Sequence, residues 1–133
     1  MYDGLARILA IDDEADFSAT IKSGLEAYGF EVETYNDPEL VLSQFKASKY
    51  DMVLLDFDMP KMDGIDVFQE IRRRDGDVRI CFLSGYDKYY KEFNDLFPES
   101  GVRLFIQKPI GIAELVSRIN SELNPPIPSA AGN

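Results

Sequence analysis

Residues 52–64, with the sequence MVLLDFDMPKMDG, contain a strand signal, two closely spaced acids and a turn signal. The apolar run at residues 52–55 is short and uninterrupted, which is typical of a strand buried on both faces of a parallel sheet. The run closes on Asp56, and the Pro and Gly residues that follow predict a turn-rich loop before the next helix. The stretch therefore predicts a buried strand that delivers an acidic side chain to a loop.

The same order of strand, loop and helix recurs on both sides of this stretch. Apolar runs predict five strands, at residues 7–11, 30–35, 52–55, 78–83 and 103–106. Apolar residues at helical spacing predict five helices, at residues 15–28, 38–45, 65–71, 89–97 and 112–123. Gly29 is placed to end the first helix. The second strand ends in Asn36-Asp37, which the N-cap of the second helix already explains. Because right-handed crossovers place helices on both faces of a parallel sheet, the pattern predicts a doubly wound, three-layer α/β fold.

Length and composition restrict the organisation of the chain. The 133 residues, 45% of them hydrophobic, fit one domain, which we assign to residues 1–123. Residues 124–133 hold three prolines and no periodicity, so we expect a disordered tail or the start of a linker there. A formal net charge of -10 disfavours nucleic-acid binding. We also expect no membrane segment and a cytoplasmic location.

Two residue types narrow the chemistry further. The chain has no histidine, which excludes His-based metal sites and Ser-His-Asp triads on this chain. Its single cysteine, Cys81, lies within an apolar run and is expected to be a buried core thiol.

Polar residues follow four of the predicted strands, at the edge of the sheet where ligands bind in open α/β folds. They are Asp12 and Asp13, Asp56, Ser84, and Lys108. Three converging carboxylates repel one another and raise the pKa of at least one of them, so a cation should lie among them. Oxygen ligands favour Mg²⁺. Together with the charge of Lys108 and the hydroxyl of Ser84, the acids and their cation are predicted to bind a phosphoryl group.

These residues stand in motifs that resemble the receiver domain of two-component response regulators. The resemblance covers residues 6–123, and its motifs are IDDE at 11–14, LD at 55–56, MPKMDG at 59–64, LSG at 83–85 and KP at 108–109. It implies a flavodoxin-like fold and phosphorylation of Asp56 by the phosphohistidine of a sensor kinase or phosphotransfer protein. The domain would be a switch that assists its own loading and unloading, rather than an enzyme.

The resemblance also implies a role for each site residue. Asp13, Asp56 and the backbone carbonyl of Asp58 would bind Mg²⁺ directly, and Asp12 would contribute through water. Ser84 and Lys108 would hold the phosphoryl oxygens, and Ser84 and Phe105 would act as switch residues. Phe105 is equally explained as an ordinary packed strand residue.

Two features depart from the family pattern. Asp58 places an acid two residues after the acceptor, where it is either a solvated loop residue or a group that tunes the dephosphorylation rate. The second departure is the stretch between Ser84 and Lys108, which is longer than the family pattern. Its helix is aromatic, with Tyr89, Phe93 and Phe97 on one face and Tyr86 and Tyr90 off it. Core packing explains the first face, whereas the other two rings predict a partner surface. A homodimer through the fourth helix, fifth strand and fifth helix is the corresponding possibility.

Two other interpretations compete with a phosphorylated receiver. Asp56-Phe57-Asp58 after an apolar strand also resembles the nucleophile motif of haloacid dehalogenase-type hydrolases, although that motif normally closes the first strand and here closes the third. The second is a receiver-like interaction module that is not phosphorylated. Such modules typically lack one of the acids, the hydroxyl or the lysine, and all are present here.

Overall fold

The computed structural model describes residues 6–59, 64–85 and 88–124. Its five strands are β1 (Arg7–Ile11), β2 (Glu31–Tyr35), β3 (Met52–Asp56), β4 (Arg79–Ser84) and β5 (Leu104–Gln107). The helices that alternate with them are α1 (Ala15–Ala27), α2 (Pro38–Gln44), α3 (Gly64–Arg74), α4 (Lys88–Leu96) and α5 (Ile112–Leu123). Every element expected from the sequence is present.

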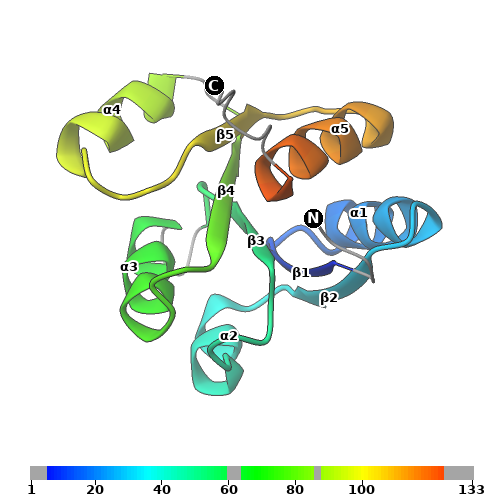
Figure 1. The fold of residues 1–133 in the computed structure, drawn as a ribbon, viewed down its shortest axis with the longest axis horizontal. Helices are drawn as coiled ribbons and strands as arrows, with labels where there is room; N and C mark the ends of the chain where they lie inside the picture. The colour runs from blue at the N-terminus through cyan, green and yellow to red at the C-terminus, as the bar shows by residue number, and fades with distance from the viewer. Residues whose placement is uncertain (1–5, 60–63, 86–87, 125–133) are drawn as a thin grey trace, which may run out of the picture.

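The strands form one parallel sheet in the order β2-β1-β3-β4-β5. Figure 1 shows α1 and α5 on one side of this sheet and α2, α3 and α4 on the other. The two faces carry separate apolar cores, one with buried residues of α1 and α5 and the other with buried residues of α3 and α4. This arrangement confirms the doubly wound, flavodoxin-like fold, and its strand order puts β1 and β3 side by side at the centre of the sheet.

The predicted helix ends have the expected local chemistry. The Asp37 carboxylate accepts a hydrogen bond of 3.0 Å from the backbone N–H of Glu39, and Pro38 is the first helical residue of α2. Gly29 follows α1 with a φ of 96°, a conformation that glycine adopts without strain. These contacts stop α1 before β2 and start α2 after it.

The observed bounds of β4 and β5 lie one residue beyond the predicted ones. The backbone N–H of Val78 donates to the Asp75 carboxylate, so this residue belongs to the preceding turn and not to the strand. At the other end Ser84 is in register with Gln107, which extends both strands. The shift makes Ser84 the last residue of a strand and thereby fixes its position.

Other expectations are confirmed or lie outside the described residues. Cys81 is fully buried, as expected, and burial raises the pKa of its thiol. Among the described residues, no helix is long and apolar enough to cross a membrane. Residues 125–133 and Tyr86 lie outside the described part, as does the side chain of Tyr89.

Candidate functional site

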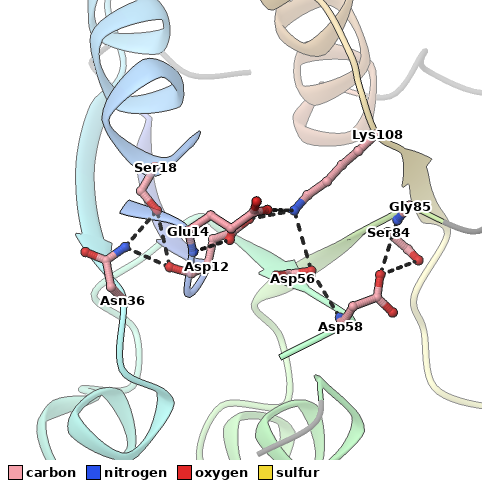
Figure 2. A network of polar contacts seen from close by, with 9 residues as sticks. All are labelled: Asp12, Glu14, Ser18, Asn36, Asp56, Asp58, Ser84, Gly85 and Lys108. Atoms are coloured by element: carbon pink, nitrogen blue, oxygen red, sulfur yellow. Dashed lines mark hydrogen bonds and ion pairs between the residues drawn. The ribbon is translucent and has the colours of Figure 1, made fainter. Parts of the chain in front are cut away.

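Four strands deliver polar side chains to one edge of the sheet. Asp12 follows β1, Asp56 ends β3, Ser84 ends β4, and Lys108 follows β5. The first three are almost inaccessible to solvent, with exposed fractions of 3%, 2% and 0%. Figure 2 shows these side chains facing one another across the ends of the strands. The structure thus brings together the residues that the sequence placed at separate strand ends.

The acids form a cluster suited to a hard cation. Asp12, Asp13 and Asp56 each offer a carboxylate oxygen, and these oxygens lie within 4.8 Å of one another. Burial raises the pKa of Asp56 to about 7. The charge of Asp12 and a side-chain hydrogen bond with Asp13 add to the effect, whereas the backbone hydrogen bond from Asp58 and the charge of Lys108 oppose it. The donor set fits Mg²⁺, which prefers carboxylate oxygens together with water and phosphate.

Lys108 supplies the positive charge at this edge. Its Nζ lies 2.9 Å from Asp12 Oδ2, 3.2 Å from Glu14 Oε1 and 3.7 Å from Asp56 Oδ1. Burial disfavours its charge, but its hydrogen bond to Asp12 and the charge of Asp56 outweigh that effect and hold its pKa above the usual value. Nζ also lies 4.4 Å from the centre of the Phe17 ring, over the face of the ring. These contacts fix the lysine against the acid cluster.

Asp58 faces the opposite side of the site. Its backbone N–H donates to Asp56 Oδ1 at 3.0 Å. Its carboxylate accepts from the Ser84 hydroxyl at 3.0 Å and from the Gly85 N–H at 3.2 Å (Figure 2). Ladder hydrogen bonds from Phe57 N–H to Leu83 O and from Lys108 N–H to Ser84 O extend past the strands and set the spacing of these loops.

Sequence reasoning gave no site role to two residues that support this edge. Asn36 Nδ2 donates to the Asp12 carbonyl at 2.7 Å and to Ser18 Oγ at 3.0 Å, whereas we had assigned the end of β2 to helix capping alone. Glu14 is the second carboxylate on Lys108, and its place in the IDDE motif was the available signal. Both contacts join segments distant in sequence, so no local pattern identifies the partner of either side chain.

Gly64, the first residue of α3, lies directly against the backbone of Asp56 and Phe57. A Cβ at this position would lie 2.8 Å from Phe57 Cα and 2.9 Å from the Asp56 carbonyl oxygen, both of which are backbone atoms. Its N–H donates to the Phe57 carbonyl. Only glycine permits this approach directly behind the acceptor residue.

Phe105 lies on β5 among other aromatic rings. Its ring centre is 5.4 Å from that of Phe57, 5.5 Å from that of Phe82 and 5.5 Å from that of Tyr90. Tyr90 is 43% exposed, in agreement with the expectation for this side of the aromatic helix, while Phe93 is buried. Phe105 therefore connects the loop beside Asp56 with an exposed ring on α4.

Comparison with known proteins agrees with this geometry. The transcriptional regulatory protein PrrA of Mycobacterium tuberculosis is 35% identical over 117 residues, which are 88% of this chain and 49% of that protein. The response regulator TrrA of Thermotoga maritima, solved in complex with Mg²⁺-BeF, is 29% identical with a TM-score of 0.76, covering 90% of this chain and 99% of that one. A CheY-like receiver domain from Methanospirillum hungatei has the same fold, with a TM-score of 0.80 at 23% identity, and 91% and 95% of the two chains are covered.

The family match also decides against one of the two rival interpretations left open by the sequence. The chain spans about half the length of the curated relatives it matches. The sequence pattern of the family described as response regulator receiver domain matches residues 8–120, which include the acid cluster and all five strands except Arg7 at the start of β1. That match leaves the hydrolase interpretation without support. The chain belongs to the receiver domain family of two-component response regulators.

Proposed function

We propose that this receiver domain accepts a phosphoryl group on Asp56 from the phosphohistidine of a sensor kinase or phosphotransfer protein. The observation that carries the proposal is the setting of the Asp56 carboxylate. It lies 3.7 Å from Lys108 Nζ, and oxygens of Asp12 and Asp13 lie within 4.8 Å of it. A nucleophilic carboxylate beside a fixed cation and a cation-binding acid pair is the arrangement that phosphoryl transfer requires.

In the transfer step a carboxylate oxygen of Asp56 attacks the phosphorus in line. The phosphorus–nitrogen bond of the donor breaks, and the imidazole leaves with the bonding electrons. Lys108 moves from Asp12 toward the phosphoryl oxygens, whose charge it neutralises, and the Ser84 hydroxyl donates to one of them. Because Ser84 and Phe105 lie on neighbouring strands, movement of Ser84 toward the phosphoryl group would free space for the Phe105 ring.

A cation completes the electrostatics. Asp12, Asp13 and Asp56 would hold Mg²⁺ together with the backbone carbonyl of Asp58, with Asp12 acting through water. When bound, the ion supplies the positive charge that keeps Asp56 ionised near neutral pH and neutralises phosphoryl oxygens.

Loading with acetyl phosphate and Mg²⁺, followed by intact-mass measurement, tests the acceptor. We expect the wild type to gain the mass of one phosphoryl group and Asp56→Ala to gain none. Asp95→Ala, which removes an exposed carboxylate on α4, is the matched control and should load as the wild type does. The proposal is refuted if the wild type gains no mass, or if Asp56→Ala still gains the mass of a phosphoryl group.

Asp58 is the proposed rate-tuning residue. Its backbone N–H bonds the Asp56 carboxylate, and its own carboxylate lies against Ser84 and Gly85, so its charge and hydrogen bonding should set how long a phosphoryl group on Asp56 stays. The phosphoprotein half-life of Asp58→Asn tests this role. An unchanged half-life would contradict it.

The proposed output surface is the face formed by α4, β5 and α5. Tyr90 and Leu96 are exposed on α4, with exposed fractions of 43% and 68%, and Tyr90 contacts Phe105. Exposed aromatic side chains of this kind are enriched at protein interfaces. We propose that phosphorylation, in the cytoplasm, switches this face toward a downstream protein or a second copy of the chain. Sedimentation analysis with and without beryllofluoride tests the dimer, and Tyr90→Ser should weaken it.

A further inference from the structure

The Asp58 carboxylate accepts two hydrogen bonds from the protein, whereas a solvated loop acid would bond water instead. Its Oδ2 atom alone accepts both the Ser84 hydroxyl, at 3.0 Å, and the Gly85 N–H, at 3.2 Å. These donors come from the end of β4, which is 26 residues away in sequence. Figure 2 shows the carboxylate pointing away from the acids and toward this strand end. One anionic oxygen is therefore held by a pair of donors across the site.

The same pair of donors suits a phosphoryl oxygen. A hydroxyl and an adjacent backbone N–H that converge on one point form a small anion-binding cradle, and charge-assisted hydrogen bonds to it are stronger than neutral ones. The cradle stands beside Asp56, because Asp58 N–H bonds the Asp56 carboxylate while Asp58 Oδ2 fills the cradle. A phosphoryl group on Asp56 would place its oxygens in this space.

We propose that the Asp58 carboxylate is a built-in competitor of the phosphoryl group. In the unphosphorylated domain it occupies the cradle formed by Ser84 and Gly85, and phosphorylation of Asp56 must displace it. This inference deepens the proposed function and rests on it, since the cradle matters only if Asp56 takes a phosphoryl group.

The positions of the other charges agree with a displaceable competitor. Lys108 is bonded to Asp12 and Glu14 and not to Asp58, so the Asp58 carboxylate occupies only the donor side of the site. Asp58 itself is exposed, while Ser84 is fully buried. An exposed carboxylate can turn into water at little cost, whereas the buried hydroxyl needs an acceptor in either state. Exchange of one anionic oxygen for another keeps Ser84 satisfied throughout.

The contact should reduce affinity for a phosphoryl analogue. We expect Asp58→Ala to bind beryllofluoride in the presence of Mg²⁺ about three- to tenfold more tightly than the wild type, the range that loss of one or two competing hydrogen bonds allows. Affinity is measured by titration, and Mg²⁺ affinity is measured separately so that an effect on the ion can be subtracted. Asp95→Ala is again the control and should bind as the wild type does.

A double-mutant cycle separates direct competition from simple charge repulsion. In a Ser84→Ala background one of the two donors is missing, so the gain from Asp58→Ala should shrink. Repulsion alone would give the same gain in both backgrounds, and that result would overturn the proposal. An unchanged affinity of Asp58→Ala would also overturn it.

The free protein provides a readout that does not depend on phosphorylation. The Gly85 amide resonance should shift in Asp58→Ala without any ligand, because its hydrogen-bond acceptor is gone. No shift would show that the contact is absent in solution and would refute the competitor. If neither the wild type nor Asp58→Ala binds beryllofluoride although the Gly85 shift is present, the result instead rejects phosphorylation at Asp56.

Discussion

Replacing Asp56 with Asn should stabilise the fold, because it removes a charge from a buried and acid-rich site. The Asp56 side chain is 2% exposed, and its pKa rises from an ordinary value of 3.8 to about 7. Each pKa unit corresponds to about 1.4 kcal/mol, so holding this carboxylate ionised in the folded state costs about 4 kcal/mol. The Asn side chain can still accept the Asp58 N–H, but it loses the ion pair with Lys108. We therefore expect a net gain of about 2–4 kcal/mol above pH 8.

The sign of the pH dependence follows from the raised pKa. Between about pH 4 and pH 7 the folded wild type binds a proton on Asp56 that the unfolded chain has released. The wild type therefore loses stability as the pH rises through this window, and Asp56→Asn does not suffer this loss. Below about pH 4 the residue is neutral in both states, so the difference between the two proteins should vanish.

Urea denaturation at several pH values, without divalent cations, measures this difference directly. Asp95→Asn removes a carboxylate whose side chain is 67% exposed, and should change stability by less than about 0.5 kcal/mol with no trend across the window. Addition of Mg²⁺ should raise the melting temperature of the wild type more than that of Asp56→Asn, since the substitution removes one ligand. The quantity to compare is the difference in unfolding free energy between Asp56→Asn and the wild type. If this difference is no larger at pH 8 than at pH 4, the reasoning is refuted.

Three further substitutions test the support of the site. Gly64→Ala should cost about 1–3 kcal/mol because its Cβ would meet backbone at 2.8 Å, while Gly76→Ala, with open space around it, should be near neutral in urea denaturation. Asn36→Ala should cost about 1–2 kcal/mol and weaken Mg²⁺ binding, measured by calorimetry, since it frees the loop after β1. Glu14→Gln should lower the pKa of Lys108 in an NMR titration; an unchanged pKa would contradict their ion pair.

The order of elements and the location of the site could be predicted from sequence, because both depend on local signals. Uninterrupted apolar runs specify buried strands, and the polar residues after them must lie at one edge of a parallel sheet. The convergence of Asp12, Asp13 and Asp56 follows from this rule alone, as does a raised pKa among them. The bounds of β4 were less predictable, because the hydrogen bond from the Val78 N–H to the Asp75 carboxylate holds Val78 in the preceding turn.

The partners of each side chain could not be predicted in this way. The sequence placed Asp58 beside the acceptor, but it did not indicate that its carboxylate would bond Ser84 and Gly85 instead of turning into water. Asn36 was explained by capping, and its hydrogen bond to the Asp12 carbonyl became visible only with β1 and β2 side by side. Such contacts depend on distances of a few tenths of an ångström between loops, which strand register and packing set.

For this protein, then, the sequence by itself determined the doubly wound fold, the family and the set of residues at the strand ends. Hydrophobic periodicity and strand polarity are sufficient for the fold and the strand ends, and the motifs that resemble receiver domains are sufficient for the family, since none of these signals depends on exact distances. Only the tertiary structure decided that Lys108 is held by Asp12 and Glu14 and that Asp58 fills the donors of β4. Hydrogen bonds form only within about 3 Å, and residues 26 to 96 positions apart reach that distance only after the sheet has assembled.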